Sequence, residues 1–79
     1  MVNHKIILNS ISKVKEFVEI TMMVDFDVDI ISGRYTINAK SIMGIFSLDL
    51  SKKLELVIRG GNEEEITEYL KSITRFIVT

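Results

Sequence analysis

The sequence has no cysteine and a single histidine, His4. Without cysteine the chain cannot form disulfides, thiolate nucleophiles or cysteine-ligated zinc sites. One imidazole cannot build a histidine cluster around a metal ion. Because no catalytic motif is recognisable elsewhere, we expect a protein that is not an enzyme, holds no metal and needs no cofactor.

A large excess of positive or negative charge is also missing. Ten basic and eleven acidic residues leave a net charge of −1, although 27% of the chain is charged. Surfaces that bind nucleic acids concentrate positive charge on one face. We therefore expect no nucleic-acid partner.

Long apolar runs are absent as well. The apolar runs extend over a few residues only, whereas a membrane-spanning helix needs about 20. Residues 1–8 lack the apolar stretch and the small-residue cleavage site of a signal peptide. These features predict a cytoplasmic protein without a membrane partner. The length of 79 residues predicts one domain, residues 1–79, with a thin core, because such a chain buries only about 60% of its unfolded surface.

What the first half does contain is a clear switch of hydrophobic period. Residues 5–8 are a short apolar run that predicts a first strand. Residues 12–23 carry apolar side chains at helical spacing and predict a helix. Residues 25–30 then alternate between aspartate and apolar side chains, as in a strand with one face in water. With the turn at Ser32-Gly33, residues 26–38 predict a β-hairpin.

The second half continues with a short helix, a strand and a longer helix. Ser41 is a suitable N-cap for the short helix. Residues 54–59 alternate between apolar and charged side chains and predict a fourth strand. Asn62 and Glu65 have the spacing of a capping box, which predicts a helix start.

The resulting order, β-α-β-β-α-β-α, predicts an α+β fold. We expect three helices to cover one face of a four-stranded antiparallel sheet. The aspartates of residues 25–29 suit the opposite face. The apolar residues expected in the core are Val14, Phe17, Val28, Ile30, Ile37, Leu56, Ile58, Ile66, Leu70 and Ile73.

Residues 38–48 read Asn-Ala-Lys-Ser-Ile-Met-Gly-Ile-Phe-Ser-Leu. This segment resembles the N-x-K-S-I-M-G-x-x-S-L segment of HPr, the histidine-containing phosphocarrier of the bacterial phosphoenolpyruvate-dependent sugar phosphotransferase system. Asp27-Val28 resembles the second strand of that family, and residues 61–64 resemble the acidic start of its last helix. The resemblance extends over residues 24–74. It implies an open-faced β-sandwich with strand order 1-4-2-3.

The first 20 residues depart from the family pattern. HPr carries phosphate on a histidine in a G-I-H-A-R-P-A motif at the N-terminus of its first helix. Counting back from Ser41 without gaps, the corresponding residues 8–14 read Leu-Asn-Ser-Ile-Ser-Lys-Val, with Ser10 at the histidine position and Ser12 at the arginine position. A seryl phosphate is a stable ester, unlike the labile phosphoimidazole that the relay requires. We expect His4 to precede a strand, with no helix dipole behind it, as an ordinary edge or surface histidine.

Ser41 matches the regulatory serine that an ATP-dependent HPr kinase phosphorylates in some bacteria. We expect the helix N-terminus and the adjacent Lys40 to favour a phosphate there; the alternative is that Ser41 is an N-cap only. Ile42, Met43 and Phe46 match the apolar surface by which the family docks on partners. The alternative for these three is core packing, which we expect for one of them.

The resemblance implies a regulatory, partner-docking member of the family without histidine phosphotransfer. In this it is similar to the catabolite-repression HPr homologue Crh, which lacks the histidine and binds a transcription regulator once its serine is phosphorylated. Ser12 stands where the family arginine helps bind that regulator, so the partner can differ. Two alternatives remain: a phosphocarrier that uses another residue, and a structural remnant whose family segment serves folding alone. The sequence specifies neither the partner nor the oligomeric state.

Overall fold

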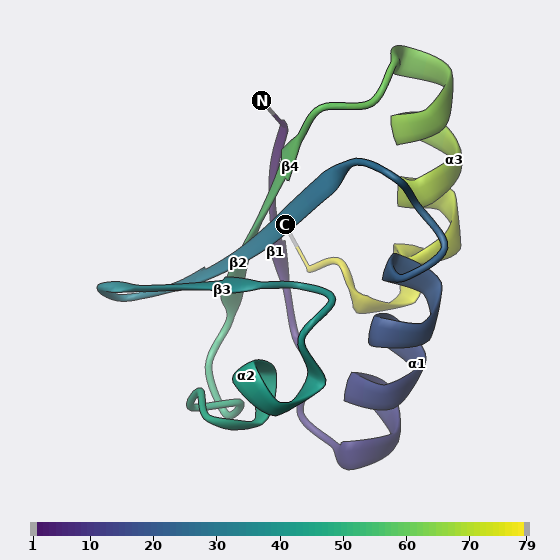
Figure 1. Ribbon diagram of the computed structural model, residues 1–79. Helices are drawn as coiled ribbons and strands as arrows, with labels where there is room; N and C mark the ends of the chain where they lie inside the picture. The colour runs from purple at the N-terminus through teal and green to yellow at the C-terminus, as the bar shows by residue number, and fades with distance from the viewer. Residues whose placement is uncertain (1, 79) are drawn as a thin grey trace.

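A computed structural model describes residues 2–78, which form both helices and strands (Figure 1). The four strands form an antiparallel sheet in the order β1-β4-β2-β3. The predicted α+β class, element order and strand order are confirmed. The elements are β1 (Val2–Ile6), α1 (Ile11–Thr21), β2 (Asp27–Ser32), β3 (Tyr35–Asn38), α2 (Ile42–Phe46), β4 (Leu54–Arg59), α3 (Glu63–Ser72) and the 3-10 turn η1 (Thr74–Phe76).

The predicted β-hairpin consists of β2 and β3. Gly33 occupies the turn with a φ of 61°, a left-handed conformation that glycine adopts without steric cost. Ile30 lies opposite Ile37 in the register, so both point to the same face of the sheet. In Figure 1 the turn of this hairpin projects beyond the helices.

The two faces of the sheet differ as the alternation in the sequence predicts. Val28 of β2 lies opposite Ile58 of β4, and both are buried on the side that the helices cover. Asp27 and Asp29, the intervening residues of β2, point to the uncovered side, because side chains alternate along a strand. There Arg59 donates from Nε to Asp29 across 2.7 Å.

The core contains the residues that the hydrophobic pattern predicts. Of the ten predicted core residues, seven are buried, and Ile37, Ile66 and Leu70 are half-buried against the core. The structure adds further buried residues, among them Ile6, Leu8, Ile45, Leu54, Tyr69 and Phe76. Phe76 reaches the core from η1 and packs edge-to-face on Phe17, with ring centroids 5.9 Å apart.

Element boundaries at the two ends of the chain differ from the predicted ones. The first strand covers residues 2–6 rather than 5–8, because its position is set by pairing with β4, where Ile6 lies opposite Leu54. The first helix ends at residue 21 instead of 23. The segment after α3 was not predicted to be structured, yet it pairs with the outer edge of β1. Ile7 N donates to Phe76 O and Val78 N donates to Lys5 O, each across 2.9 Å.

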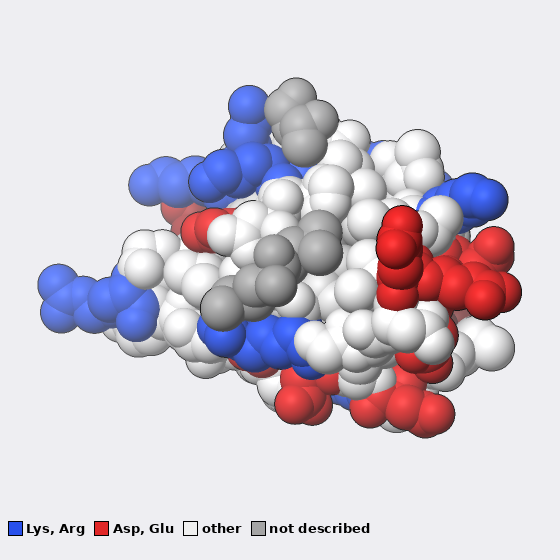
Figure 2. All heavy atoms as spheres, turned by 90° about the horizontal axis from the view of Figure 1, so that it is seen from above, with Lys and Arg blue, Asp and Glu red and all other residues white. Residues whose placement is uncertain are grey.

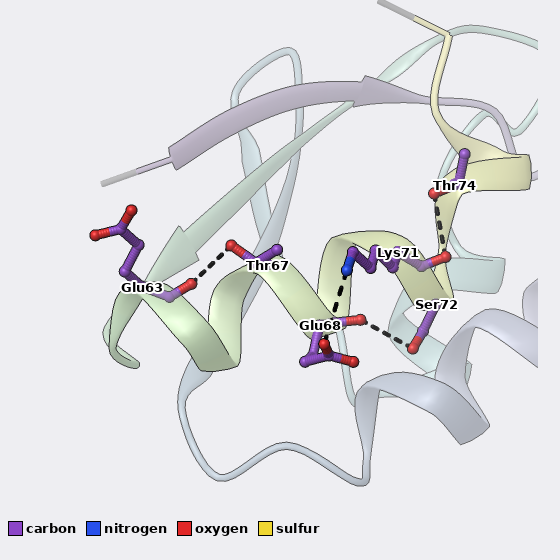
Figure 3. A network of polar contacts seen from close by, with 6 residues as sticks. All are labelled: Glu63, Thr67, Glu68, Lys71, Ser72 and Thr74. Carbon is purple, nitrogen blue, oxygen red and sulfur yellow. Dashed lines mark hydrogen bonds and ion pairs between the residues drawn. The ribbon is translucent and has the colours of Figure 1, made fainter.

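Helix α3 has a polar outer surface and the predicted cap. Asn62 accepts from Glu65 N at 2.8 Å, and Glu65 accepts in return from Asn62 N at 3.0 Å, so the capping box is confirmed. Along the outer surface, hydroxyls donate to carbonyls one turn earlier, for example Thr67 to Glu63 at 2.8 Å (Figure 3). Over the described residues 2–78, no helix combines the length and the apolar character needed to span a membrane.

Candidate functional site

Ser41 caps the short helix α2, as predicted. Its hydroxyl oxygen accepts a hydrogen bond from Gly44 N at 3.3 Å, and its backbone is extended. The side chain is exposed to solvent. In the first turn, Ile42 and Met43 carry the N–H groups that a helix leaves without a partner inside the helix. An anion on the Ser41 oxygen would therefore lie beside free donors, although a helix of five residues has only a small dipole.

The side chain of Lys40 makes a hydrogen bond that the sequence did not indicate. Its Nζ donates to the backbone carbonyl of Val24, at a distance of 2.7 Å, in a partly buried position. The Lys40 ammonium thus ties the segment before α2 to the connection between α1 and β2. The structure thus holds the ammonium at the Val24 carbonyl, and no hydrogen bond joins it to Ser41 among the described residues.

Gly44 is required by close packing. A Cβ atom at this position would lie 2.7 Å from Ile37 Cγ2 and 3.0 Å from Ser41 Oγ. Helix α2 therefore approaches β3 at a distance that only glycine permits. Gly44 also holds Ser41 in place, because its N–H donates the capping hydrogen bond to the Ser41 hydroxyl. The glycine that follows Met43 is thus explained by packing against Ile37.

Helix α2 exposes apolar side chains to solvent. Met43 is 77% exposed and Phe46 is 37% exposed, whereas Ile42 is half-buried against the core. The expectation that one of the three packs into the core thus falls on Ile42. Ile11 at the start of α1 is also exposed, to 65%, and was not singled out from the sequence. Its signal was its place directly after the Ser10 cap, in the first turn of α1.

Figure 1 shows α2 and the start of α1 at the same end of the molecule, and the two helices are in contact. We call Ile11, Ile42, Met43 and Phe46 the α1–α2 apolar patch. Ser41 lies at its edge, because it precedes Ile42 directly. A modified serine at this position would change the charge beside an exposed apolar surface.

Helix α1 begins at a serine. Ser10 has an extended backbone, and its hydroxyl oxygen accepts from Lys13 N at 3.2 Å. The hydroxyl of Ser12 lies 3.4 Å from that of Ser10. The ammonium of Lys13 donates to Asn9 Oδ1 at 3.0 Å. The residues at the N-terminus of α1 are therefore small polar groups, Ile11 and one lysine, and none of them carries an imidazole or a guanidinium.

His4 lies within β1, not before a strand as expected. It is opposite Leu56 in the register and half-buried on the side of the sheet that the helices cover. No helix begins there, so no row of free N–H groups faces the imidazole. β1 is an edge strand of the sheet, in agreement with the interpretation of His4 as an edge histidine.

The chain matches a known protein family over most of its length. The family model PTS-HPr, described as the PTS HPr component phosphorylation site, matches residues 12–77, which is most of the chain. The match begins at Ser12 and includes all of α2 and the α1–α2 apolar patch except Ile11. No curated protein matches the sequence.

Solved structures of the same family have the same fold. HPr-C-His from Thermoanaerobacter tengcongensis has a TM-score of 0.75 and 26% identity, over 95% of this chain and 89% of that chain. The phosphocarrier protein HPr from Bacillus anthracis has a TM-score of 0.71 and 23% identity, over 98% and 96%. Crh from Bacillus subtilis, which forms a domain-swapped dimer in its crystal structure, has a TM-score of 0.64 and 24% identity, over 100% and 93%. The family match over most of the chain and the shared fold together show that this chain belongs to the HPr phosphocarrier family of the phosphotransferase system.

Proposed function

We propose that this chain is a regulatory, partner-docking member of the HPr family that does not carry phosphate on a histidine. The observation that carries the proposal is the N-terminus of α1. Its N-cap is Ser10, whose oxygen binds Lys13 N, while His4 lies within β1. We infer that Ser10, with its hydroxyl, stands where the family presents its phosphoryl acceptor.

The chemistry of the two acceptors differs in a way that matters for a carrier. A phosphoimidazole has a high transfer potential and passes its phosphoryl group to the next protein. A phosphoserine is a stable ester and retains it. His4 is half-buried on a strand and lacks the helix N-terminus that stabilises phosphoryl oxygens, so it is a poor replacement.

Ser41 is the proposed modification site. In the reaction, its Oγ forms a bond to the γ-phosphorus of ATP. The bond from that phosphorus to the bridging oxygen breaks, ADP leaves, and the hydroxyl proton passes to a base of the kinase. The exposure of Ser41 and the unpaired first-turn N–H groups of α2 favour this site. An exposed phosphate at a helix start is worth about 0.3–1 kcal/mol, too little to change the fold.

The proposed consequence is a change in partner binding. The α1–α2 apolar patch exposes Ile11, Met43 and Phe46 to solvent, and apolar anchors of this kind commonly dominate the energy of protein interfaces. A phosphate on Ser41 adds a charge of about −1.5 to −2 at the rim of this patch. We expect it to select partners that place arginine or lysine beside an apolar contact.

A phosphotransfer assay tests the first part. The protein is incubated with phosphoenolpyruvate and the general phosphotransferase enzyme, with the HPr of Bacillus anthracis as the positive control. We expect acid-labile phosphate on the control and none on this chain. Acid-labile, base-stable phosphate that disappears in the variant His4→Ala would instead establish the alternative, a phosphocarrier that uses an unusual residue.

A kinase assay tests the second part. The protein is treated with an HPr kinase and ATP, the modified residue is mapped by mass spectrometry, and partner capture is compared before and after treatment. Ser41→Ala should abolish modification. Ser47→Ala is the matched control, because Ser47 is also exposed but caps the opposite, C-terminal end of the same helix. If Ser41 stays unmodified and Ser41→Ala lowers stability alone, Ser41 is a helix cap and the chain is a structural remnant.

A further inference from the structure

A second surface lies at the other end of α1. Between this end of α1, the α1–β2 connection and α3 the molecule has a groove of about 460 Å³. We call it the α1–α3 groove. Ile20, Met23 and Val24 line one side, and the nearly buried rings of Phe26 and Tyr69 belong to its lining. These two rings stack edge-to-face with centroids 5.8 Å apart, so they form a firm apolar floor.

The rim of the α1–α3 groove carries charge of one sign. Asp25, Glu64, Glu65 and Glu68 line it, and no lysine or arginine does so among the described residues. Figure 2 shows acidic side chains gathered on the side of the molecule where Figure 1 places α3. The four carboxylates do not converge as metal ligands, since residues 2–78 contain no group of three potential ligands close enough to hold an ion.

Most of this negative charge is not neutralised within the chain. Glu68 has a long contact of 3.9 Å to Lys71, and both side chains are largely exposed (Figure 3). Such a pair is worth little in water. Asp25 and Glu64 form no ion pair with any other residue in the described part of the chain. A partner with basic side chains would therefore find unpaired carboxylates around the groove.

Met23 is an exposed apolar side chain of the α1–α3 groove. Its side chain is 84% exposed, the largest value among the exposed large hydrophobic residues. Methionine is unbranched and polarisable, so it adapts its shape to a bound surface. Lysine and arginine can lay their aliphatic stems on such a surface while their charged ends reach carboxylates. The apolar floor and the acidic rim thus suit the same kind of occupant.

The α1–α3 groove is separate from the α1–α2 apolar patch. Ile11 begins α1, whereas Met23 lies just beyond its C-terminal end. A helix of 11 residues is about 16 Å long. One partner could therefore occupy the groove while another occupies the patch.

We propose that the α1–α3 groove binds a segment of a partner protein in which an apolar side chain is flanked by lysine or arginine. The apolar side chain would contact Met23 and Phe26, and the basic side chains would pair with Asp25, Glu64 and Glu68. The volume of the groove lies within the range of sites that enclose small groups of atoms rather than a whole helix. The proposal does not depend on the fate of Ser41 or on the absence of histidine phosphotransfer.

The test is a nuclear magnetic resonance titration of the uniformly ¹⁵N-labelled full chain. The probe is a synthetic peptide of alternating lysine and leucine, and the control peptide has glutamate in place of each lysine. We expect the lysine peptide to shift the amide signals of Met23, Val24, Glu64 and Glu68. The affinity should fall as salt is added, because charge pairs at the rim are screened. The glutamate peptide should leave these signals unchanged.

Matched variants locate the binding. Met23→Ser should weaken the affinity about tenfold or more, as expected for a buried methionine contact. Met22→Ser is the control, because Met22 is also exposed, to 63%, but does not line the groove. Glu64→Gln should weaken binding about two- to fivefold, by the size of an exposed charge pair. Its control is Glu63→Gln, in the same helical turn but outside the groove.

Several results would overturn the proposal. These are equal binding of the two peptides, shifts confined to Ile11 and Met43, or equal losses for the Met22 and Met23 variants. Concentration-dependent shifts of the groove signals without any peptide would also overturn it, since they would assign the groove to a second copy of the chain.

Discussion

Replacing Gly44 by alanine should destabilise the protein, although the same replacement usually stabilises a helix. Inside a helix, alanine is favoured over glycine by about 1 kcal/mol. Here, however, the added Cβ would lie 2.7 Å from Ile37 Cγ2 and 3.0 Å from Ser41 Oγ. Ile37 is β-branched and sits on β3, so its Cγ2 methyl cannot rotate away without leaving its preferred rotamer.

The magnitude follows from three contributions. Overpacking a well-filled site costs about 1–3 kcal/mol. Disturbing the Ser41 cap costs about 1 kcal/mol more. After the gain in helix propensity of about 1 kcal/mol is subtracted, the net loss is about 1–3 kcal/mol. For a domain of this size, each kcal/mol lowers the melting temperature by about 4–8 °C.

Urea unfolding followed by circular dichroism measures this loss. The diagnostic experiment repeats Gly44→Ala in the background Ile37→Ala, in which the clashing methyl is absent. There the change should cost little or stabilise, because the two sites share one contact. Gly33→Ala is the control, because Gly33 has a φ of 61° and open space around it. The loss of stability caused by Gly33→Ala should therefore be the same in both backgrounds. A higher urea midpoint for Gly44→Ala in the wild-type background, or equal losses in both backgrounds, would refute the packing argument.

Three further changes test contacts elsewhere in the fold. Burial raises the pKa of Tyr69 to about 12. The unfolded chain therefore loses this proton first. The free energy of unfolding should fall by up to about 1.4 kcal/mol per pH unit as the pH rises above about 10. Tyr69→Phe should remove this pH dependence when unfolding is measured at a series of pH values. Asn62→Ala breaks the capping box with Glu65 and should lower stability by about 1 kcal/mol in urea unfolding. Lys40→Met leaves the partly buried Val24 carbonyl without its donor and should cost about 1–3 kcal/mol in the same assay; an unchanged midpoint would show that this hydrogen bond contributes nothing.

Local patterns in the sequence were sufficient for the elements and for the caps. The capping box of Asn62 and Glu65 and the Ser41 cap were predicted correctly because each joins groups three residues apart. The alternation in residues 26–30 predicted correctly which side of β2 is buried, because neighbouring side chains of a strand point in opposite directions. The α+β class followed from the order of these elements.

The candidate site was only partly predictable. The sequence indicated Ser41, Ile42, Met43 and Phe46 through their resemblance to a family segment, and the roles of these residues remain proposals. It did not indicate Ile11, which joins the patch because α1 and α2 meet at one end of the fold. It also did not indicate the contact of Lys40, because the carbonyl that binds its ammonium belongs to Val24, 16 residues away in the chain.

Hydrophobic periods, helix caps and turns could be predicted from the residues alone, since these depend on interactions between residues a few positions apart. Packing between distant segments sets where β1 begins, that residues 76–78 pair with its edge, and that Gly44 contacts Ile37. It also determines that Met23 and the carboxylates of α3 line one groove. Backbone hydrogen bonds between strands are nearly independent of side-chain identity, and contacts between distant segments depend on how the elements pack. No local pattern in the sequence therefore indicates these hydrogen bonds or these contacts.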